Sequence, residues 1–523
     1  MSLRENIDRL VRYCGQYQAH GFMMDERNTD MGFNVELPEE REIRDRIGEL
    51  RVILFTGEAG DGKSRIIRNL KGLLSENHFT DPCMDFSALA EEEKKALIKT
   101  LRQTVDGVRE EKLVICANVG VFTQAVLRYD MSLMKELTGG RRDVHICNFE
   151  KRNLAEDEEV FGEIVRVFLT GGKGIDECLS CTEEACPCRE DCQYRVNIEK
   201  LLSESGTGAL RTICDTIYLT GGHITFRELL SMLSYTVTFG QDCRERQKYV
   251  EAGGSLEKVA YYNIFEKSGD MLLSKVSKMD PALKKGKHPP DVCTGEQYVP
   301  YRRKRFFDAG QDRYTMLNVD YLTEFVDVLE YMDKAPYNYD VVRDRHPVLV
   351  RLKKGINKMS SQGRSDAGLV VTDTPLILGS KIRLEFQVMQ NVGMVWHRYD
   401  VGAAKGSISA SRRWNKFYLS YVGRREEGKG RKLISLLIDY QQFRYLMMCS
   451  DDFFMNRSEL TVEEYAVNTF YRKILREREQ AYDAVLIRFD DREDCCDFSL
   501  TVHDSEDIFS DANDQTILIR RES

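Results

Sequence analysis

The sequence lacks any apolar run that could cross a membrane, and it is poor in proline. No stretch approaches the roughly eighteen uninterrupted apolar residues of a membrane span, and residues 1–6 (MSLREN) lack the apolar core of a signal peptide. Ten prolines in 523 residues, with no low-complexity tract, predict little disorder. The net charge of −9 excludes a surface covered throughout by basic residues, although it leaves room for a local basic groove. We therefore expect a cytoplasmic protein that does not contact a membrane.

Residues 57–64 read GEAGDGKS and complete every fixed position of the phosphate-binding P-loop pattern. A strand-like apolar run precedes them, and apolar residues at helical spacing follow. Glycines permit positive φ angles, so successive backbone N–H groups and the helix N-terminus can point at one anion. This context predicts nucleoside triphosphate binding, and a glycine-rich turn that merely precedes a helix is the alternative. The predicted nucleotide-binding residues are Gly57, Gly60, Asp61, Gly62, Lys63 and Ser64.

Two side chains of this segment carry the expected chemistry. The ammonium group of Lys63 is expected to reach the β- and γ-phosphates of the nucleotide. The hydroxyl of Ser64 is expected to bind Mg²⁺, which prefers oxygen ligands. The sequence therefore predicts a nucleotide site that also holds a magnesium ion.

Strand-like runs alternate with helical stretches after the loop, which indicates a parallel sheet covered on both faces. The runs are residues 82–87, 112–118 and 143–149. Polar groups at the ends of such strands lie where a doubly wound fold binds its ligand.

Two of these strand-end residues are candidates for the chemistry. Asp85 is predicted to hold Mg²⁺ through water, although the usual acidic pair is absent; the alternative is a turn aspartate before a helix capped at Ser87. Asn118 is predicted to orient the attacking water near the γ-phosphate, with a turn residue before Gly120 as its alternative.

Residues 221–230 open a helix with a capping box formed by Thr225 and Glu228. Arg227 lies in the first turn of that helix. In many ring-forming ATPases an arginine at the start of a lid helix touches the γ-phosphate, so Arg227 is a candidate for that role, and an exposed helical arginine is the alternative. His223 is interpreted as a loop histidine rather than a catalytic base.

Fifteen cysteines are unusual for a cytosolic protein, and five of them fall within residues 178–192. A reducing compartment disfavours disulfides, whereas closely spaced thiolates in a polar loop suit tetrahedral Zn²⁺. We predict a structural zinc rather than an iron–sulfur cluster, and thiols without a metal are the alternative. The zinc ligands are expected to be four of Cys178, Cys181, Cys186, Cys188 and Cys192.

The second half of the chain carries weaker patterns. Residues 301–307 (YRRKRFF) place four cations beside aromatic residues, which suits a grip on a nucleic-acid backbone, an arginine offered to a neighbouring subunit, or a solvated helix face. From about residue 369 alternating runs indicate antiparallel strands, with helices near 433–449 and 461–482. Residues 411–418 interleave basic and aromatic side chains, which suits nucleic acid or a partner protein, although a strand with a wet face is a sufficient explanation. No nuclease motif or nucleophile triad occurs there, so we expect a docking module.

These motifs and their order resemble DptF-like ATPases, which are bacterial defence proteins associated with phosphorothioate-dependent DNA restriction. The resemblance covers roughly residues 40 to 310 and rests on motif order. It is carried by the GEAGDGKS loop, residues 84–88, residues 116–120, the cysteine segment ending in Asn197, and residues 223–227.

The resemblance implies an AAA-like ATPase core that uses ATP and Mg²⁺, a cysteine-rich insertion, and partner proteins of a defence operon that act on DNA. It assigns catalytic roles to Lys63, Asp85, Asn118 and Arg227. The lack of a glutamate beside Asp85 departs from vigorous ATPases of this class. Binding of DNA, directly or through partners, and self-association into a homo-oligomer are both left open.

The expected fold class is α/β, with an AAA-like P-loop NTPase core built on a parallel sheet. The expected domains are this core at 1–170, a zinc knuckle at 171–200, a helical lid at 201–335, and a β-rich domain with a helical insertion at 336–523. Two functions compete: an ATPase that licenses or remodels a DNA-targeting complex, and a nucleotide-gated scaffold with little or no hydrolysis. A signal-sensing ATPase that oligomerises ranks lower, because no repeat array or toxic effector domain is evident.

Overall fold

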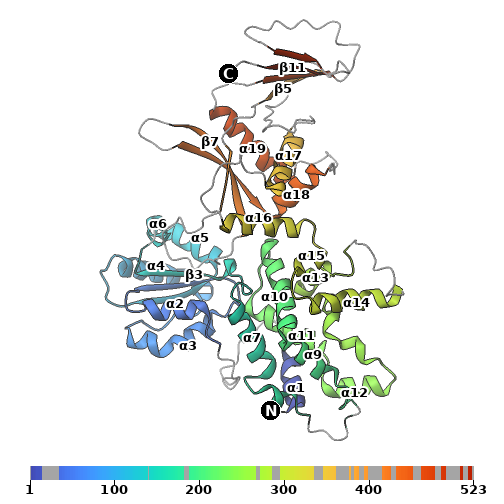
Figure 1. The fold of residues 1–523 in the computed structure, drawn as a ribbon. Coiled ribbons are helices and arrows are strands. Elements are labelled where there is room, and N and C mark those ends of the chain that lie inside the picture. The colour runs from blue at the N-terminus through green and yellow to red at the C-terminus, as the bar shows by residue number, and fades with distance from the viewer. Residues whose placement is uncertain are drawn as a thin grey trace. The chain divides into compact units, whose positions relative to one another are not determined.

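The computed structural model shows a mixed α/β protein whose described residues form two compact units (Figure 1). One is built from the described residues of Met1–Val319 and the other from those after Val319. The residues outside the description are 1, 15–34, 139–140, 182–185, 187, 267–270, 285–294, 335–345, 361–375, 378–381, 388–393, 399–414, 426–430, 452–460, 478–483, 490–506, 511–515 and 521–523.

A three-stranded parallel sheet forms the centre of the first unit, in the order β2-β1-β3. Its strands are β1 (Val52–Thr56), β2 (Leu113–Ala117) and β3 (Val144–Asn148). Every residue of β1 and β2 is buried, as expected of strands covered on both faces. Thr56, the last residue of β1, is in register with both Ala117 and Asn148, so all three strands end at one edge. The predicted α/β class with a parallel sheet is confirmed.

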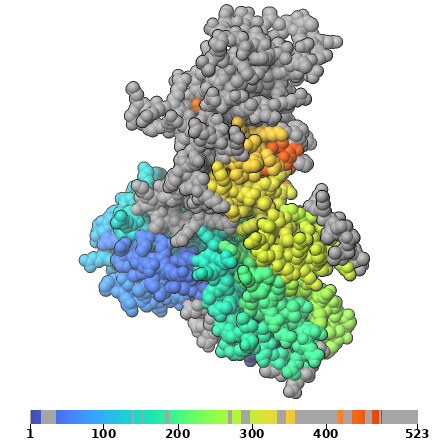
Figure 2. All heavy atoms as spheres, in the orientation of Figure 1, coloured from blue at the N-terminus to red at the C-terminus, as the bar shows by residue number. Residues whose placement is uncertain are grey.

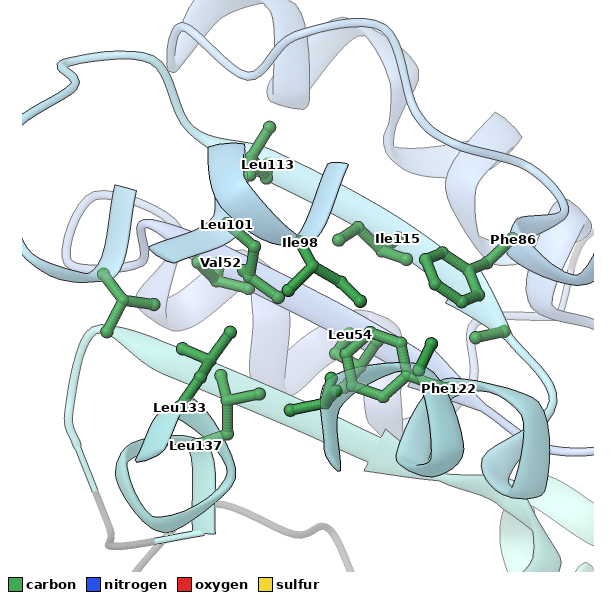
Figure 3. Packing of buried hydrophobic residues seen from close by; sticks show 14 of the residues in the cluster. Val52, Leu54, Phe86, Ile98, Leu101, Leu113, Ile115, Phe122, Leu133 and Leu137 are labelled. Atoms are coloured by element: carbon green, nitrogen blue, oxygen red, sulfur yellow. The ribbon is translucent and has the colours of Figure 1, made fainter. Parts of the chain in front are cut away.

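Helices on both sides of the sheet bury its faces. One face packs against α4 (Glu91–Val105), α5 (Val119–Tyr129) and α6 (Met131–Thr138), whose apolar side chains meet Val52 and Leu54 of β1 (Figure 3). On the other side lie α2 (Pro38–Arg46) and α3 (Lys63–Glu76) (Figure 1). The glycine-rich segment therefore leaves the covered sheet at the end of β1 and leads into α3.

The predicted strand at 82–87 is not a continuous strand. Single parallel bridges join Phe79 to Lys112 and Cys83 to Ile115, and the chain then turns into a 3-10 helix, η3 (Phe86–Ala88). The segment still lies along β2, because these bridges place it beside that strand. Asp85 therefore arrives near the predicted edge, on a turn.

The rest of the first unit is helical. The helix α1 (Leu3–Cys14) belongs to this part, since Asn6 Nδ2 donates to the carbonyl of Leu169 at 2.8 Å. In the space-filling view the blue atoms of the sheet part lie directly against the green atoms of the helical part (Figure 2). The helices are α7 (Glu158–Thr170), α8 (Ile175–Leu179), α9 (Gln193–Leu202), α10 (Glu204–Leu219), α11 (Phe226–Thr238), α12 (Cys243–Glu251), η5 (Leu256–Val259), η6 (Tyr261–Phe265), α13 (Met271–Lys278), α14 (Gly295–Asp308) and α15 (Arg313–Met316), besides η4 (Phe149–Lys151) after β3.

The basic stretch at 301–307 lies in α14 and contributes one of its four cations and both phenylalanines to the core. Arg303 is 7% exposed, and its Nη2 lies 2.7 Å from Asp280 Oδ2. Phe306 and Phe307 are fully buried. Arg303 is therefore neither solvated nor available to phosphate, because it is already neutralised inside the protein, whereas Lys304 and Arg305 are exposed as a solvated face requires.

The second unit combines helices with two antiparallel sheets, ordered β10-β11-β9-β5-β4 and β6-β7-β8. The predicted helix at 433–449 is wrong in its first half, which is strand β8; the helix itself starts at Tyr440. Residues 411–414 of the basic and aromatic stretch lie outside the described residues. The elements are α16 (Leu322–Lys334), α17 (Pro347–Ser360), β4 (Leu376–Ile377), β5 (Ile382–Gln387), β6 (Met394–Arg398), β7 (Lys416–Arg425), β8 (Arg431–Asp439), α18 (Tyr440–Ser450), α19 (Val462–Glu477), β9 (Ala484–Phe489), β10 (Asp507–Ser510) and β11 (Thr516–Arg520).

Aromatic packing joins the sheet β6-β7-β8 to the helices of the second unit. The ring of Phe325 in α16 lies 5.0 Å from that of Phe443 in α18 and 6.4 Å from that of Phe417 in β7.

Across the described ranges, no helix is both long and apolar enough to pass through a bilayer.

Candidate functional site

The candidate site lies at the carboxyl edge of the parallel sheet, where residues 57–64, here named the glycine loop, join β1 to α3. Gly57, Gly60 and Gly62 have φ angles of 148°, 103° and 89°. Side-chain-bearing residues rarely adopt such angles, so the loop depends on glycine at these positions. A Cβ atom on Gly57 would lie 2.4 Å from Asp61 Oδ2 and 2.9 Å from Phe149 Cβ. The loop thus turns tightly into the N-terminus of α3, an arrangement suited to anions.

Lys63 folds back over the loop. Its Nζ donates to the carbonyl oxygens of Gly57 and Glu58, at 2.7 and 2.6 Å. Burial lowers the pKa of Lys63, the negative charges of Asp61 and Asp85 oppose that shift, and the positive charge of Arg152 adds to it. The ammonium group therefore lies against the backbone of the glycine loop, and the carboxylates of Asp61 and Asp85 offset the effect of burial only in part. Its partners are backbone carbonyls, which an anion of higher charge can displace.

Asp61 ties the loop to itself and to the helical part. Its side chain is fully buried, Oδ2 accepts from the Glu58 N–H at 2.6 Å, and Oδ1 accepts from His223 Nε2 at 2.9 Å. A buried carboxylate requires such partners, because an unpaired one carries a large desolvation cost. Asp61 was predicted as a nucleotide-binding residue, whereas its side chain bonds to the backbone of the loop and to His223.

The first turn of α11 lies against the loop. The backbone N–H of Arg227 donates to the carbonyl of Gly60 at 3.0 Å, and a Cβ on Gly60 would lie 3.0 Å from Arg227 Cβ. The predicted capping box is present: Glu228 N donates to Thr225 Oγ1 at 3.2 Å, and Thr225 N donates to Glu228 Oε2 at 2.7 Å. The predicted lid arginine thus stands at the loop, brought there by a helix that is far away in the sequence.

The two strand-end candidates reach the same edge but cap helices there. Asp85 Oδ1 accepts from Ser87 N at 2.9 Å at the start of η3. Asn118 Oδ1 accepts from Gly120 N at 3.0 Å and from Val121 N at 3.3 Å at the start of α5. Ser64, the predicted magnesium ligand in α3, is exposed. The turn weighed as the alternative for Asn118 is present. Asp85 also lies on a turn, but Asp85 itself caps η3 and Ser87 lies within that helix. Catalytic roles have to use the remaining lone pairs of both side chains.

Sequence reasoning missed Arg152 and the role of His223. Arg152 follows β3, and its Nη2 donates to the carbonyl of Asp61 at 2.7 Å. His223 was interpreted as a loop histidine, yet it binds the buried carboxylate of the glycine loop. The only sequence signal for Arg152 is its place just after a strand that was expected to neighbour the loop strand.

The cysteine segment is only partly brought together. Burial raises the pKa of Cys243 in α12 to about 12, and the negative charges of Cys192, Asp8, Cys186 and Cys181 add to that shift, so Cys243 shares the electrostatic environment of three predicted ligands. Cys178 is bonded within its own helix, where its Sγ donates to the carbonyl of Ile175 at 3.2 Å. Burial raises the pKa of Cys178, and the positive charge of Arg9 opposes that shift.

The described thiols do not fit a tetrahedral metal as they stand. Among the residues that the structure describes, no group of three or more His, Cys, Asp or Glu side chains is arranged to hold a metal ion. Residues 182–185 and 187, which link the thiols, lie outside that description. The predicted zinc therefore depends on the spacing of the cysteines.

The chain matches no protein-family model, no curated protein and no solved structure. Its function has to be argued from the residues at the carboxyl edge of the sheet.

Proposed function

We propose that the protein binds ATP with Mg²⁺ at the glycine loop and hydrolyses it. The observation that carries this proposal is the loop itself: three glycines with positive φ lead from the central strand into a helix N-terminus, with Lys63 folded over the turn. Backbone N–H groups at such a turn favour phosphate groups. Lys63 adds the charge that stabilises the β- and γ-phosphates, and Mg²⁺, when bound beside Ser64, neutralises the phosphate charge that develops during transfer.

Asp85, Asn118 and Arg227 are proposed to serve the hydrolytic step. Asp85 assists the metal, Asn118 orients water, and Arg227 approaches the terminal phosphate from the start of α11. Support comes from their placement, since Asp85 contributes to the electrostatic environment of Lys63 and the Arg227 backbone donates to Gly60. Positioning and charge neutralisation are the main means by which proteins accelerate phosphoryl transfer.

The cellular role that we propose rests on the resemblance to DptF-like ATPases. In it, ATP turnover licenses or remodels a DNA-targeting complex of a bacterial anti-phage restriction system, in the cytoplasm and together with other proteins of the same operon. DNA is contacted directly or through those partners, and self-association completes the assembly. The buried Arg303 removes one candidate DNA contact, so we place more weight on contact through partners.

A nucleotide-gated scaffold is the second candidate, and a specific observation favours it. One oxygen each of Asp85 and Asn118 is occupied in capping a helix, and no second carboxylate adjoins Asp85. Such a site binds nucleotide but hydrolyses it slowly. Tight ATP binding with no turnover under any stimulus, partner proteins included, is the result that this candidate predicts.

A structural zinc in the cysteine segment is also proposed, with four thiolates as ligands. Support comes from the spacing of the predicted cysteines and from the mutual influence of Cys181, Cys186 and Cys192 on Cys243.

The experiment that tests the nucleotide proposal compares phosphate release by the wild type and by Lys63→Ala. Loss of the lysine is expected to weaken nucleotide binding by about two orders of magnitude, because a charge-assisted contact to phosphate is worth roughly 1.5–3 kcal/mol. The fold is expected to persist, since Lys63 bonds only to carbonyls of its own loop. Retained hydrolysis in the variant contradicts the site assignment.

A further inference from the structure

Arg152 is a largely enclosed cation that is bonded to the glycine loop, and the proposed reaction has given it no role. The chain leaves β3 at Asn148, whose Oδ1 accepts from Glu150 N at 3.1 Å and so starts the short turn η4. Arg152 ends that turn, and its Nη2 donates to the carbonyl oxygen of Asp61 at 2.7 Å. Because β3 pairs with β1, this turn and the glycine loop emerge side by side from the sheet.

A pair of stacked rings packs against the guanidinium group of Arg152. Arg152 Cζ lies 4.5 Å from the centroid of the Phe149 ring, which in turn stacks on Phe55 with centroids 6.0 Å apart and planes at 17°. Both phenylalanines are 1% exposed. A guanidinium held against a buried aromatic face is pre-organised, so little rotamer entropy is lost when it donates a hydrogen bond.

The charge of Arg152 is incompletely neutralised. Its side chain is 9% exposed, and its closest carboxylate oxygen is Glu39 Oε1, 3.7 Å from Nη1. Among the described residues, neither Nε nor Nη1 has a hydrogen-bond partner. Its positive charge also contributes to lowering the pKa of Lys63 and Arg65, after the larger effect of burial. Cations crowded in this way favour a bound polyanion.

The hydrogen bond to Asp61 acts on a peptide group that matters for anions. The carbonyl of Asp61 and the N–H of Gly62 belong to one peptide, and Gly62 is the N-cap of α3. A cation on the carbonyl oxygen polarises the peptide and makes its N–H a stronger donor. The same bond fixes the orientation of the peptide plane, which the absence of a side chain on Gly62 leaves free to rotate.

We infer that Arg152 is a positioning residue that holds and polarises the Asp61–Gly62 peptide of the glycine loop so that its N–H binds nucleotide phosphate. The inference rests on the proposed nucleotide binding and deepens it. Arg152 acts through the loop and leaves the phosphate contact to the backbone. It therefore strengthens binding of every ligand whose phosphate occupies the loop, with ADP and pyrophosphate affected as much as ATP.

The test measures dissociation constants of ATP, ADP and inorganic pyrophosphate by calorimetry, together with kcat and KM, for Arg152→Gln and Arg152→Lys. The glutamine variant is expected to weaken all three ligands by a similar factor of about 10 to 100, because it removes a charge-assisted hydrogen bond. The lysine variant keeps the charge without the stacked fork, and its loss is expected to be smaller. KM is expected to rise while kcat changes little, since the loop binds ground state and transition state alike.

Two controls separate positioning from folding. Arg51→Gln removes a similar bond at the opposite end of β1, where Nη1 donates to the Thr104 carbonyl at 3.3 Å, and it is expected to leave all affinities unchanged. Arg152→Gln combined with Glu39→Gln removes the carboxylate that the single variant leaves without its cation. The double variant is expected to regain stability against heat, whereas its phosphate binding is expected to remain weak.

The outcomes are distinct. Unchanged affinities in both Arg152 variants overturn the inference, as does full recovery of binding in the double variant, which reduces Arg152 to a structural partner of Glu39. A loss confined to ATP also overturns it in favour of direct contact with the terminal phosphate. If the wild type binds none of the three ligands, the proposed function fails first and the inference fails with it.

Discussion

The glycine loop and the cysteine segment are both defined by motifs, yet the structure assembles them to different degrees. The loop is held from three directions: Arg152 bonds the Asp61 carbonyl, His223 bonds the Asp61 side chain, and the Arg227 backbone bonds Gly60. Among the described residues, the thiols of the cysteine segment form no arrangement that could hold a metal. The difference follows from chemistry, because an anion site made of backbone N–H groups needs no ligand to form, whereas thiolates repel one another until a cation joins them.

The largest expected effect is in the cysteine segment. Serine at Cys181 or Cys192 is expected to remove a zinc content of about one ion per chain and to lower the free energy of unfolding, because structural zinc contributes folding free energy. Serine at Cys178 is expected to keep the ion, since that thiol is directed to the carbonyl of Ile175. Elemental analysis of the purified variants checks both expectations. Native protein free of metal refutes the zinc proposal. Loss of zinc from the Cys178→Ser variant shows instead that Cys178 is one of the zinc ligands.

Gly57→Ala is expected to have the next largest effect. It forces a side chain into a φ of 148° and places Cβ 2.4 Å from Asp61 Oδ2. Strain and overlap together are expected to lower the free energy of unfolding by about 2–4 kcal/mol and to abolish nucleotide binding. The matched control is Gly48→Ala, where a Cβ meets nothing within 4 Å. Equal denaturation midpoints for the two variants in urea contradict the described loop geometry.

A smaller effect is expected at the link between the loop and the helical part. His223→Ala leaves the buried Asp61 carboxylate with one partner fewer, which is expected to cost about 1–3 kcal/mol in the free energy of unfolding. Asp61→Asn and the double variant complete a thermodynamic cycle whose coupling energy is expected to be at least about 0.5 kcal/mol. Urea denaturation of the four proteins supplies the values. Strict additivity excludes a direct bond between these side chains.

The sequence predicts those parts of the site that depend on local pattern. Period and glycine spacing suffice for the strand, loop and helix at 52–76, and the capping box suffices for the start of α11. They do not suffice for the bonds of Asp61, whose partners His223 and Arg152 are separated from it by 162 and 91 residues. Long-range pairing of polar side chains leaves no periodic trace in one sequence.

Two predicted segments differ from the structure, for different physical reasons. The run at 82–87 has strand composition, but it forms only a single bridge to β2 before Asp85 caps η3. Residues 301–307 have the composition of a wet basic face, but Asp280 is placed to neutralise Arg303 inside the helical part. A local cap ends the extended segment in the first case, and a long-range ion pair buries one cation in the second.

The most direct test of the account is phosphate release from ATP and GTP by the wild type and by Lys63→Ala, each alone and with duplex DNA. The wild type is expected to turn over ATP at a rate that DNA or its partner proteins raise, and the variant is expected to lose this turnover. If ATP binds but is not hydrolysed, even with partner proteins present, the same site serves the nucleotide-gated scaffold instead. Hydrolysis that survives in Lys63→Ala, or a wild type that neither binds nor hydrolyses nucleotide, contradicts the central claim that the glycine loop is a nucleotide site.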